Sequence, residues 1–164
     1  MFLELESVFN TPGLSLPFRY PLEGFDGMLP LAAPPVVSGE ARNRAGIVTL
    51  AGRAELRMDA RCDRCAAPFG YAADVPFEHT LVTGVNNAES DEGGELVLLG
   101  SYRWSPDELL WEDIVLSLPP RMLCRPGCEG LCPRCGQNLN ESPCACKPEG
   151  DPRLAALRDL MSNV

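Results

Sequence analysis

Residues 46–65 read GIVTLAGRAELRMDARCDRC, and this stretch decides the fold because polar and apolar side chains alternate until it ends in two cysteines. A period of two places successive side chains on opposite faces of a strand, so the stretch predicts a long strand with one buried face. Gly52 predicts a bend in this strand. The face expected to be buried consists of Val48, Leu50, Ala54, Leu56, Met58, Ala60 and Cys62, and the opposite face consists of Thr49, Arg53, Glu55, Arg57, Asp59 and Arg61.

The flanking sequence predicts two strand partners for this stretch. Residues 36–41 are expected to pair with it through a hairpin connection at residues 43–46, and residues 69–81 form a second alternating run. The two long strands place Cys62-Asp63-Arg64-Cys65 near a hairpin tip. His79 falls within the second run, where we expect a half-buried strand histidine with a hydrogen-bond partner. A further short strand is expected at residues 95–99.

Two helices are predicted towards the C-terminus. Ser105 is expected to cap the first, with Pro106 in its first position and Glu108 completing a capping box. Pro119-Pro120 ends this helix, and Trp111 is expected in the core. The apolar face of the first helix consists of Leu110, Trp111, Ile114, Val115 and Leu118. The second, short helix starts at Asp151, and its apolar face consists of Leu154, Leu157 and Leu160 or Met161.

The remaining segments give weaker signals. A short strand is expected within residues 2–9, and the prolines that follow favour an extended N-terminal segment up to residue 35. Residues 86–94, NNAESDEGG, are expected to form a solvated loop, with docking of a basic partner as the alternative. The prediction is an α+β protein in three parts. These are an extended segment (1–35), a curved antiparallel sheet with a packed helix (36–120), with barrel-like closure left open, and a Cys-rich tail with a terminal helix (121–164).

The tail carries the strongest chemical signal of the sequence. In a Cys-x-x-Cys turn, two intervening residues let both sulfurs reach one tetrahedral ion at about 2.3 Å. Cys132-Pro-Arg-Cys135 is such a turn, and a positive φ at the following Gly136 lets backbone N–H groups approach the thiolates. Cys144 and Cys146 supply the other two ligands. We therefore expect a zinc ion bound by Cys132, Cys135, Cys144 and Cys146.

Four of the eight cysteines remain: Cys62, Cys65, Cys124 and Cys128. They form one Cys-x-x-Cys and one Cys-x-x-x-Cys, so we expect the hairpin tip and the start of the tail to meet around a second ion. The alternative is a single zinc held by a choice among the six C-terminal cysteines, with Cys62 and Cys65 left as thiols. In either case the zinc is structural, because four cysteine ligands leave no open coordination position for a substrate.

Composition argues against several functional classes. The formal net charge of -9 disfavours non-specific coating of phosphate backbones, and a single histidine leaves little scope for classical nucleophilic catalysis. No nucleotide-binding glycine motif occurs, so neither an enzyme nor a small-molecule substrate is expected. No apolar run approaches the roughly 20 residues that a bilayer span needs, and Met1-Phe2-Leu3-Glu4 does not resemble a secretory signal. We therefore expect a cytoplasmic protein whose cysteines bind metal rather than form disulfides.

Three features together resemble the YceD family: RCDRC after a long strand, the run CRPGCEGLCPRCGQNLN followed by CAC, and DPRLAAL near the end. The resemblance extends from about Val36 to Leu160. Members of this family are named for large ribosomal RNA subunit accumulation. The resemblance implies a role in ribosome biogenesis, in the accumulation of large-subunit (23S) ribosomal RNA, and it implies no known catalysis.

The leading hypothesis is a non-enzymatic assembly factor that binds a precursor of the large ribosomal subunit, through either its RNA or a basic ribosomal protein. The alternative is a thiol–disulfide or redox-sensing protein that uses Cys62 and Cys65, with neighbouring arginines lowering a thiol pKa. Direct RNA binding by the tail has less support, because residues 121–164 contain no aromatic side chain for base stacking. The bases beside the cysteines are expected to offset thiolate charge, or else to contact RNA or protein: Arg61, Arg64, Arg121, Arg125, Arg134 and Lys147.

Overall fold

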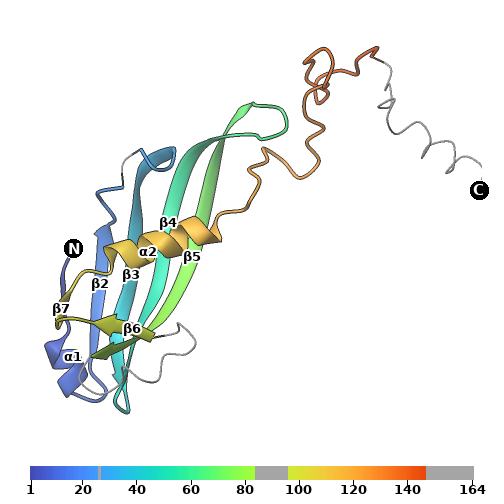
Figure 1. The fold of residues 1–164 in the computed structure, drawn as a ribbon. Helices are drawn as coiled ribbons and strands as arrows, with labels where there is room; N and C mark the ends of the chain where they lie inside the picture. Colours follow the sequence, from blue (N-terminus) through green and yellow to red (C-terminus); the bar gives the residue numbers. More distant parts are fainter. Residues whose placement is uncertain (26, 84–95, 147–164) are drawn as a thin grey trace, which may run out of the picture.

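The computed structural model describes residues 1–25, 27–83 and 96–146. Its main feature is a five-stranded sheet of strand order β2-β3-β4-β5-β6, which is not closed into a barrel (Figure 1). A two-stranded sheet of β1 and β7 and two helices complete the described part. The elements are β1 (Leu3–Glu4), α1 (Glu6–Asn10), β2 (Ser15–Pro21), β3 (Leu31–Arg44), β4 (Ile47–Arg61), β5 (Pro68–Thr83), β6 (Leu96–Leu99), β7 (Arg103–Trp104) and α2 (Asp107–Ser117).

The long antiparallel strands are those expected from the alternating pattern. β3 and β4 are joined by a turn in which Ala45 and Gly46 both have positive φ, +52° and +91°, as a two-residue hairpin requires. β4 pairs with β5 as far as Arg61 and Pro68, so the turn that carries Cys62 and Cys65 lies at the end of this hairpin. The predicted buried face is confirmed, since its six residues in β4 and Cys62, which follows the strand, are each at most 4% exposed.

The fully antiparallel sheet that we expected is wrong at one edge. β6 pairs with β5 in parallel, whereas the other neighbouring strands of this sheet are antiparallel. A parallel pair needs a crossover connection of about a dozen residues, and residues 84–95 lie between β5 and β6. Alternation along β6 (Leu96–Leu99) does not reveal its direction, because a strand has the same period of two in either orientation.

The N-terminal residues contribute more regular structure than expected. The strand predicted within residues 2–9 is present only at Leu3–Glu4 (β1), because Glu6–Asn10 is a helix (α1). Leu5 and Val8 are both 0% exposed and lie three positions apart, as on one face of a helix. In a segment this short, the apolar residues fit the period of a helix as well as that of a strand. Within the segment expected to be extended, β2 forms an edge strand of the main sheet. Its two prolines are tolerated there because an edge strand leaves half of its backbone groups unpaired.

Helix α2 lies across one face of the main sheet (Figure 1). Leu110, Trp111 and Ile114 are buried there, and Trp111 stacks on Phe25 with 4.5 Å between ring centroids, which confirms its place in the core. Val115 does not belong to this buried face, because its side chain is 43% exposed. The histidine prediction is confirmed: His79 Nε2 lies 2.7 Å from Asp113 Oδ2, and this pair joins β5 to α2.

The ends of α2 were predicted with mixed success. The helix ends at Ser117, just before Pro119-Pro120, as expected. The capping box at its start is wrong: the helix begins at Asp107, no side chain caps it, and Ser105 Oγ accepts only a 3.5 Å contact from the Asp107 backbone N–H.

Two further expectations concern segments outside the described residues: the solvated loop at 86–94 and the helix that starts at Asp151. Within the described ranges, neither helix has the length and apolar character that a membrane span needs.

Candidate metal centres

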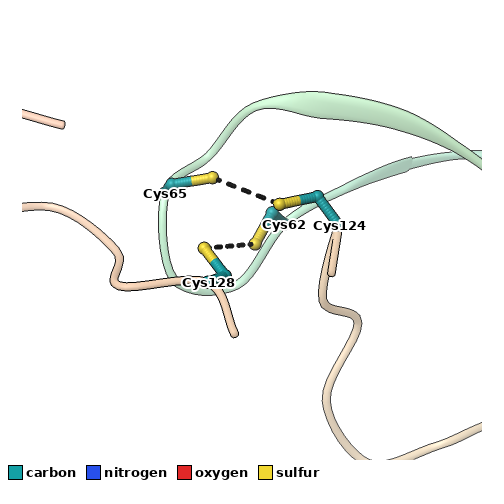
Figure 2. Close-up of side chains that lie close together, drawn as sticks. All are labelled: Cys62, Cys65, Cys124 and Cys128. Carbon is teal, nitrogen blue, oxygen red and sulfur yellow. Dashed lines mark hydrogen bonds between the residues drawn. The ribbon is translucent and has the colours of Figure 1, made fainter. Parts of the chain in front are cut away.

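The first cysteine cluster lies where the β4–β5 hairpin meets the chain that follows α2. Cys62 and Cys65 come from the hairpin turn, Cys124 and Cys128 come from the tail, and their sulfurs point towards one another (Figure 2). The four Sγ atoms lie within 4.8 Å of one another. Two Sγ–Sγ distances, Cys62 to Cys128 and Cys65 to Cys124, are 3.7 Å. The structure thus brings together the four cysteines that the sequence grouped.

These distances fit a metal ion and not a disulfide. Four sulfurs at about 2.3 Å from a tetrahedral ion are separated from one another by about 3.8 Å, whereas a disulfide holds its sulfurs about 2.05 Å apart. Cys62, Cys65 and Cys128 are 3%, 7% and 1% exposed. The donor set is soft, shielded from solvent and of the composition that zinc prefers.

The second cluster consists of Cys132, Cys135, Cys144 and Cys146, whose Sγ atoms also lie within 4.8 Å of one another. It is more open than the first, because Cys135 is exposed and only Cys132 is buried. The grouping again matches the set that the sequence spacing selected.

Both Cys-x-x-Cys segments adopt the same turn. In the second cluster, Gly136 has φ +74°, and its N–H donates to the carbonyl of Cys132 at 2.9 Å. In the first cluster, Ala66 takes this position with φ +58°, and its N–H donates to the carbonyl of Cys62 at 2.8 Å. The positive φ expected at Gly136 is therefore present, and an alanine adopts it in the other turn despite the steric cost of its Cβ.

The tail is hydrogen-bonded to the hairpin tip around the first cluster. The Asp63 N–H donates to the Met122 carbonyl at 2.8 Å, and the Met122 N–H donates to Asp63 Oδ2 at 2.6 Å. The Arg64 guanidinium donates to the Cys128 carbonyl at 2.7 Å, and the Leu131 N–H donates to the Arg64 carbonyl at 3.0 Å. The two residues between Cys62 and Cys65 thus bind the tail, a role that sequence reasoning missed for Asp63.

The thiol pKa values within each cluster are shifted in opposite directions. Backbone hydrogen bonds, chiefly at Cys124, lower the pKa of Cys62 to about 6, and backbone hydrogen bonds at Cys135 and Arg134 do the same for Cys132. Burial and the neighbouring thiols raise the pKa of Cys124 to about 12. The thiol of Cys135 is the chief cause that raises the pKa of Cys146 to about 12. Four clustered thiols cannot all ionise unless a cation balances their charge.

The basic side chains near the clusters make specific contacts where the structure defines them. Arg64 binds the Cys128 carbonyl, and the Arg125 guanidinium donates to Asn140 Oδ1 at 2.7 Å. Both contacts hold the fold of the tail rather than a thiolate directly. The proposed role of the bases in offsetting charge stays a prediction, and Lys147 lies outside the described residues.

Comparisons with known proteins place these features in a wider context. The model of a family described as "Large ribosomal RNA subunit accumulation protein YceD" matches residues 50–161. A maize protein named "Large ribosomal RNA subunit accumulation protein YCED homolog 1, chloroplastic" is 29% identical over 157 residues, covering 77% of this chain and 53% of the relative. Uncharacterized proteins of Mycobacterium bovis and Mycobacterium tuberculosis are each 30% identical over 104 residues, covering 61% of this chain and 49% of the relative.

The chain therefore spans about half the length of these curated relatives. No solved structure matches it.

Proposed function

The chain belongs to the YceD family, and from this premise we propose that it is a non-enzymatic zinc-binding factor that supports accumulation of large-subunit ribosomal RNA. The family name supplies the process. The two four-cysteine groups support the metal, and they are the observation that carries the proposal. A fully thiolate-ligated zinc has no open position for a substrate, so its role is to hold the tail in one shape.

Ordering by zinc suits a tail with little apolar material of its own. In the first cluster, the ion would join the β4–β5 hairpin to the chain after α2. In the second, it would close the segment from Cys132 to Cys146. Each filled site adds four thiolates and one Zn²⁺, a local charge of about -2. The protein would then present a rigid, acidic platform to a ribosomal precursor.

The proposed partner is a basic segment of a large-subunit ribosomal protein, and α2 offers a surface for it. A hollow of about 470 Å³ runs beside this helix, between it and the segment at Met28 and Leu29. Two apolar residues at its rim are largely exposed to solvent: Leu116 is 84% exposed and Met28 is 67% exposed. Trp111 lines its floor. Exposed apolar surface of this kind is typical of interaction sites.

The charge beside this hollow selects the kind of partner. α2 contains four acidic residues and no basic residue, and two of its acids are exposed, Glu108 and Glu112. Glu112 lines the hollow itself. The other two acids are engaged, Asp107 with the Tyr20 hydroxyl at 2.7 Å and Asp113 with His79. An amphipathic helix with leucines on one side and lysines or arginines beside them would complement both the apolar rim and the acids.

Two substitutions test this surface against purified large-subunit proteins. Leu116→Asp should weaken capture of a basic large-subunit protein at least about tenfold, the loss expected when a charge replaces a central apolar contact. Glu112→Lys should weaken capture and reduce its dependence on salt. Leu98→Asp is the matched control, because it places the same charge on another leucine, 55% exposed on β6. Equal capture by all variants would contradict docking on α2, as would binding only to a second copy of this chain.

The cellular role is tested by depletion of the protein in its own host. We expect a lower ratio of large-subunit to small-subunit ribosomal RNA, restored by the wild-type chain and by Leu98→Asp. Complementation by Leu116→Asp should fail if α2 is the docking surface. An unchanged subunit ratio after depletion would contradict the proposed role in accumulation.

The thiol–disulfide alternative makes a different prediction for the cysteines. A redox pair would give two rapidly alkylated thiols, Cys62 and Cys65, in the protein as purified. Bound zinc would keep all eight cysteines slow to alkylate until a chelator is added. The closeness of Cys124 and Cys128 to this pair favours the second outcome.

A further inference from the structure

The two cysteine clusters are next to each other both in sequence and in space. Cys128 of the first cluster and Cys132 of the second are separated by three residues. In this link, Gly130 has φ +83°, and a Cβ placed on it would lie 3.0 Å from the Arg64 carbonyl oxygen. The link is therefore packed against the hairpin tip, where the Leu131 N–H also donates to the Arg64 carbonyl at 3.0 Å.

Asn140 makes the direct contact between the clusters. It lies between Cys135 and Cys144, in the loop of the second cluster. Its Nδ2 lies 3.4 Å from Cys128 Sγ of the first cluster. Its Oδ1 accepts from the Glu129 N–H at 2.9 Å and from the Arg125 guanidinium at 2.7 Å. The side-chain amide thus holds the loop of one cluster to a ligand and to the link of the other.

We infer that Asn140 couples the two proposed zinc sites, so that zinc in either site raises the affinity of the other. The inference rests on the proposed binding of two zinc ions. A hydrogen bond to a ligating sulfur stabilises the thiolate and orients it, and such contacts around a metal site change its affinity 10- to 100-fold. Here the donor is supplied by the loop of the neighbouring site.

The order of this loop explains the direction of the coupling. None of residues 136–143 is buried, so the loop has no apolar core of its own. Its shape must come from its contacts and from the ion between Cys132 and Cys146. Filling the second site fixes the loop and presents the Asn140 N–H to Cys128. By thermodynamic reciprocity, filling the first site must then favour zinc in the second by the same factor.

The coupling is measurable from zinc affinities of the full chain and of two single-cluster variants. Cys132→Ser with Cys135→Ser leaves the first cluster, and Cys62→Ser with Cys65→Ser leaves the second. Affinities come from competition with a chelator, and native mass spectrometry counts the bound ions. The coupling factor is the two-zinc association constant of the intact chain divided by the product of the two single-cluster constants. We expect a factor of at least about five.

Substitution of Asn140 separates coupling from a general structural effect. Asn140→Asp keeps the acceptor for Glu129 and Arg125 but removes the amide donor, which contacts Cys128 Sγ and also Asn138 Oδ1 at 2.7 Å. Asn140→Leu removes both the donor and the acceptor. Either variant should bring the coupling factor towards one and still bind two zinc ions. The matched control is Gln137→Ala, because the Gln137 amide bonds within its own loop, to Ser142 Oγ at 2.6 Å. This control should retain the wild-type factor.

A failure of the coupling can be distinguished from a failure of zinc binding. A wild-type chain that binds no zinc would overturn the proposed metal sites and the coupling with them. Two zinc ions bound with a coupling factor near one would overturn the coupling alone. A Gln137→Ala variant that lowers the factor as much as Asn140→Asp does would also overturn the coupling through Asn140.

Discussion

A positive φ at Ala66 is the clearest residue-scale feature of the first cysteine cluster. Ala66 has φ +58°, in the position that Gly136 occupies in the second cluster. For a residue with a Cβ, this conformation costs about 1–2 kcal/mol. The contacts that hold Ala66 there, its own hydrogen bond to Cys62 and the neighbouring bond from the Cys62 N–H to the Ala67 carbonyl, outweigh that cost.

Replacing this alanine should therefore stabilise the protein. Ala66→Gly relieves the strain, which alone would raise the free energy of unfolding by about 1 kcal/mol. The greater conformational entropy of glycine in the unfolded chain offsets part of this gain, so the net gain is smaller. Denaturant unfolding of zinc-loaded protein measures the change. Ala67→Gly is the matched control, because Ala67 does not have a positive φ, and it should give no gain. A loss of stability in Ala66→Gly would contradict the strain argument.

Single residues were also the hardest feature to predict from sequence. The cysteines could be grouped because ligand spacing is a local property of the chain. Asn43 gave no such signal, yet it is 1% exposed and its Nδ2 donates to the Val8 carbonyl at 2.8 Å, tying α1 to the end of β3. Asn140 likewise gave no signal in the sequence, because it approaches its partner Cys128 only in the folded tail. A polar residue whose role depends on a distant partner has no local pattern.

At the scale of the elements, a pair of glycines sets how closely β3 and β4 approach. Gly39 and Gly52 are register partners, and a Cβ on either would overlap a backbone oxygen of the other strand, Ala51 O or Ser38 O. The Phe77 ring also lies over Gly52, with its Cζ 2.8 Å from the position of a Cβ. An aromatic ring over a strand glycine shields backbone that would otherwise be exposed. The interruption at Gly52, read from sequence as a bend, thus marks a close contact between strands.

This contact makes Gly52→Ala a sharp test of the sheet. The added methyl group cannot be accommodated by a side-chain rotation alone, because its closest neighbours are backbone atoms. We expect a loss of about 1–3 kcal/mol in the free energy of unfolding, the usual cost of overpacking. Gly70→Ala on β5 is the matched control, since a Cβ there meets nothing within 4 Å. Equal stability of the two variants would refute the close approach.

The elements themselves were predictable in proportion to their length. β4 and β5 alternate over many residues, so both strands and their hairpin could be inferred. Short elements could not be predicted reliably. The sequence of Glu6–Asn10 fits the period of a helix and that of a strand, and the capping pattern before α2 does not form a side-chain cap in the structure. The parallel pairing of β6 depends on a crossover rather than on any residue of the strand.

At the scale of the whole molecule, the protein has a sheet-and-helix body whose longest hairpin holds the cysteine-rich tail. The hydrogen bonds of Asp63 and Arg64 and the first cluster join the tail to the body. The apolar hollow beside α2 belongs to the body, so the proposed partner site and the proposed metal sites occupy different parts of the chain. Loss of metal should therefore release the tail while the core beneath α2 stays folded.

Limited proteolysis in the presence of a strong chelator tests this division. We expect rapid cleavage within residues 121–146 and survival of a fragment that ends near Pro120, because the body has its own apolar core. Zinc-loaded protein should resist cleavage in the same segment. Identical digestion with and without chelator would contradict a metal-ordered tail.

The most direct test of zinc binding by the two clusters is the metal content of protein purified without oxygen and without added chelator. We predict two zinc ions per chain by elemental analysis, and one in the variant that carries both Cys132→Ser and Cys135→Ser. Protein that contains no zinc, with its eight cysteines either freely reactive or paired as disulfides, would contradict both metal sites.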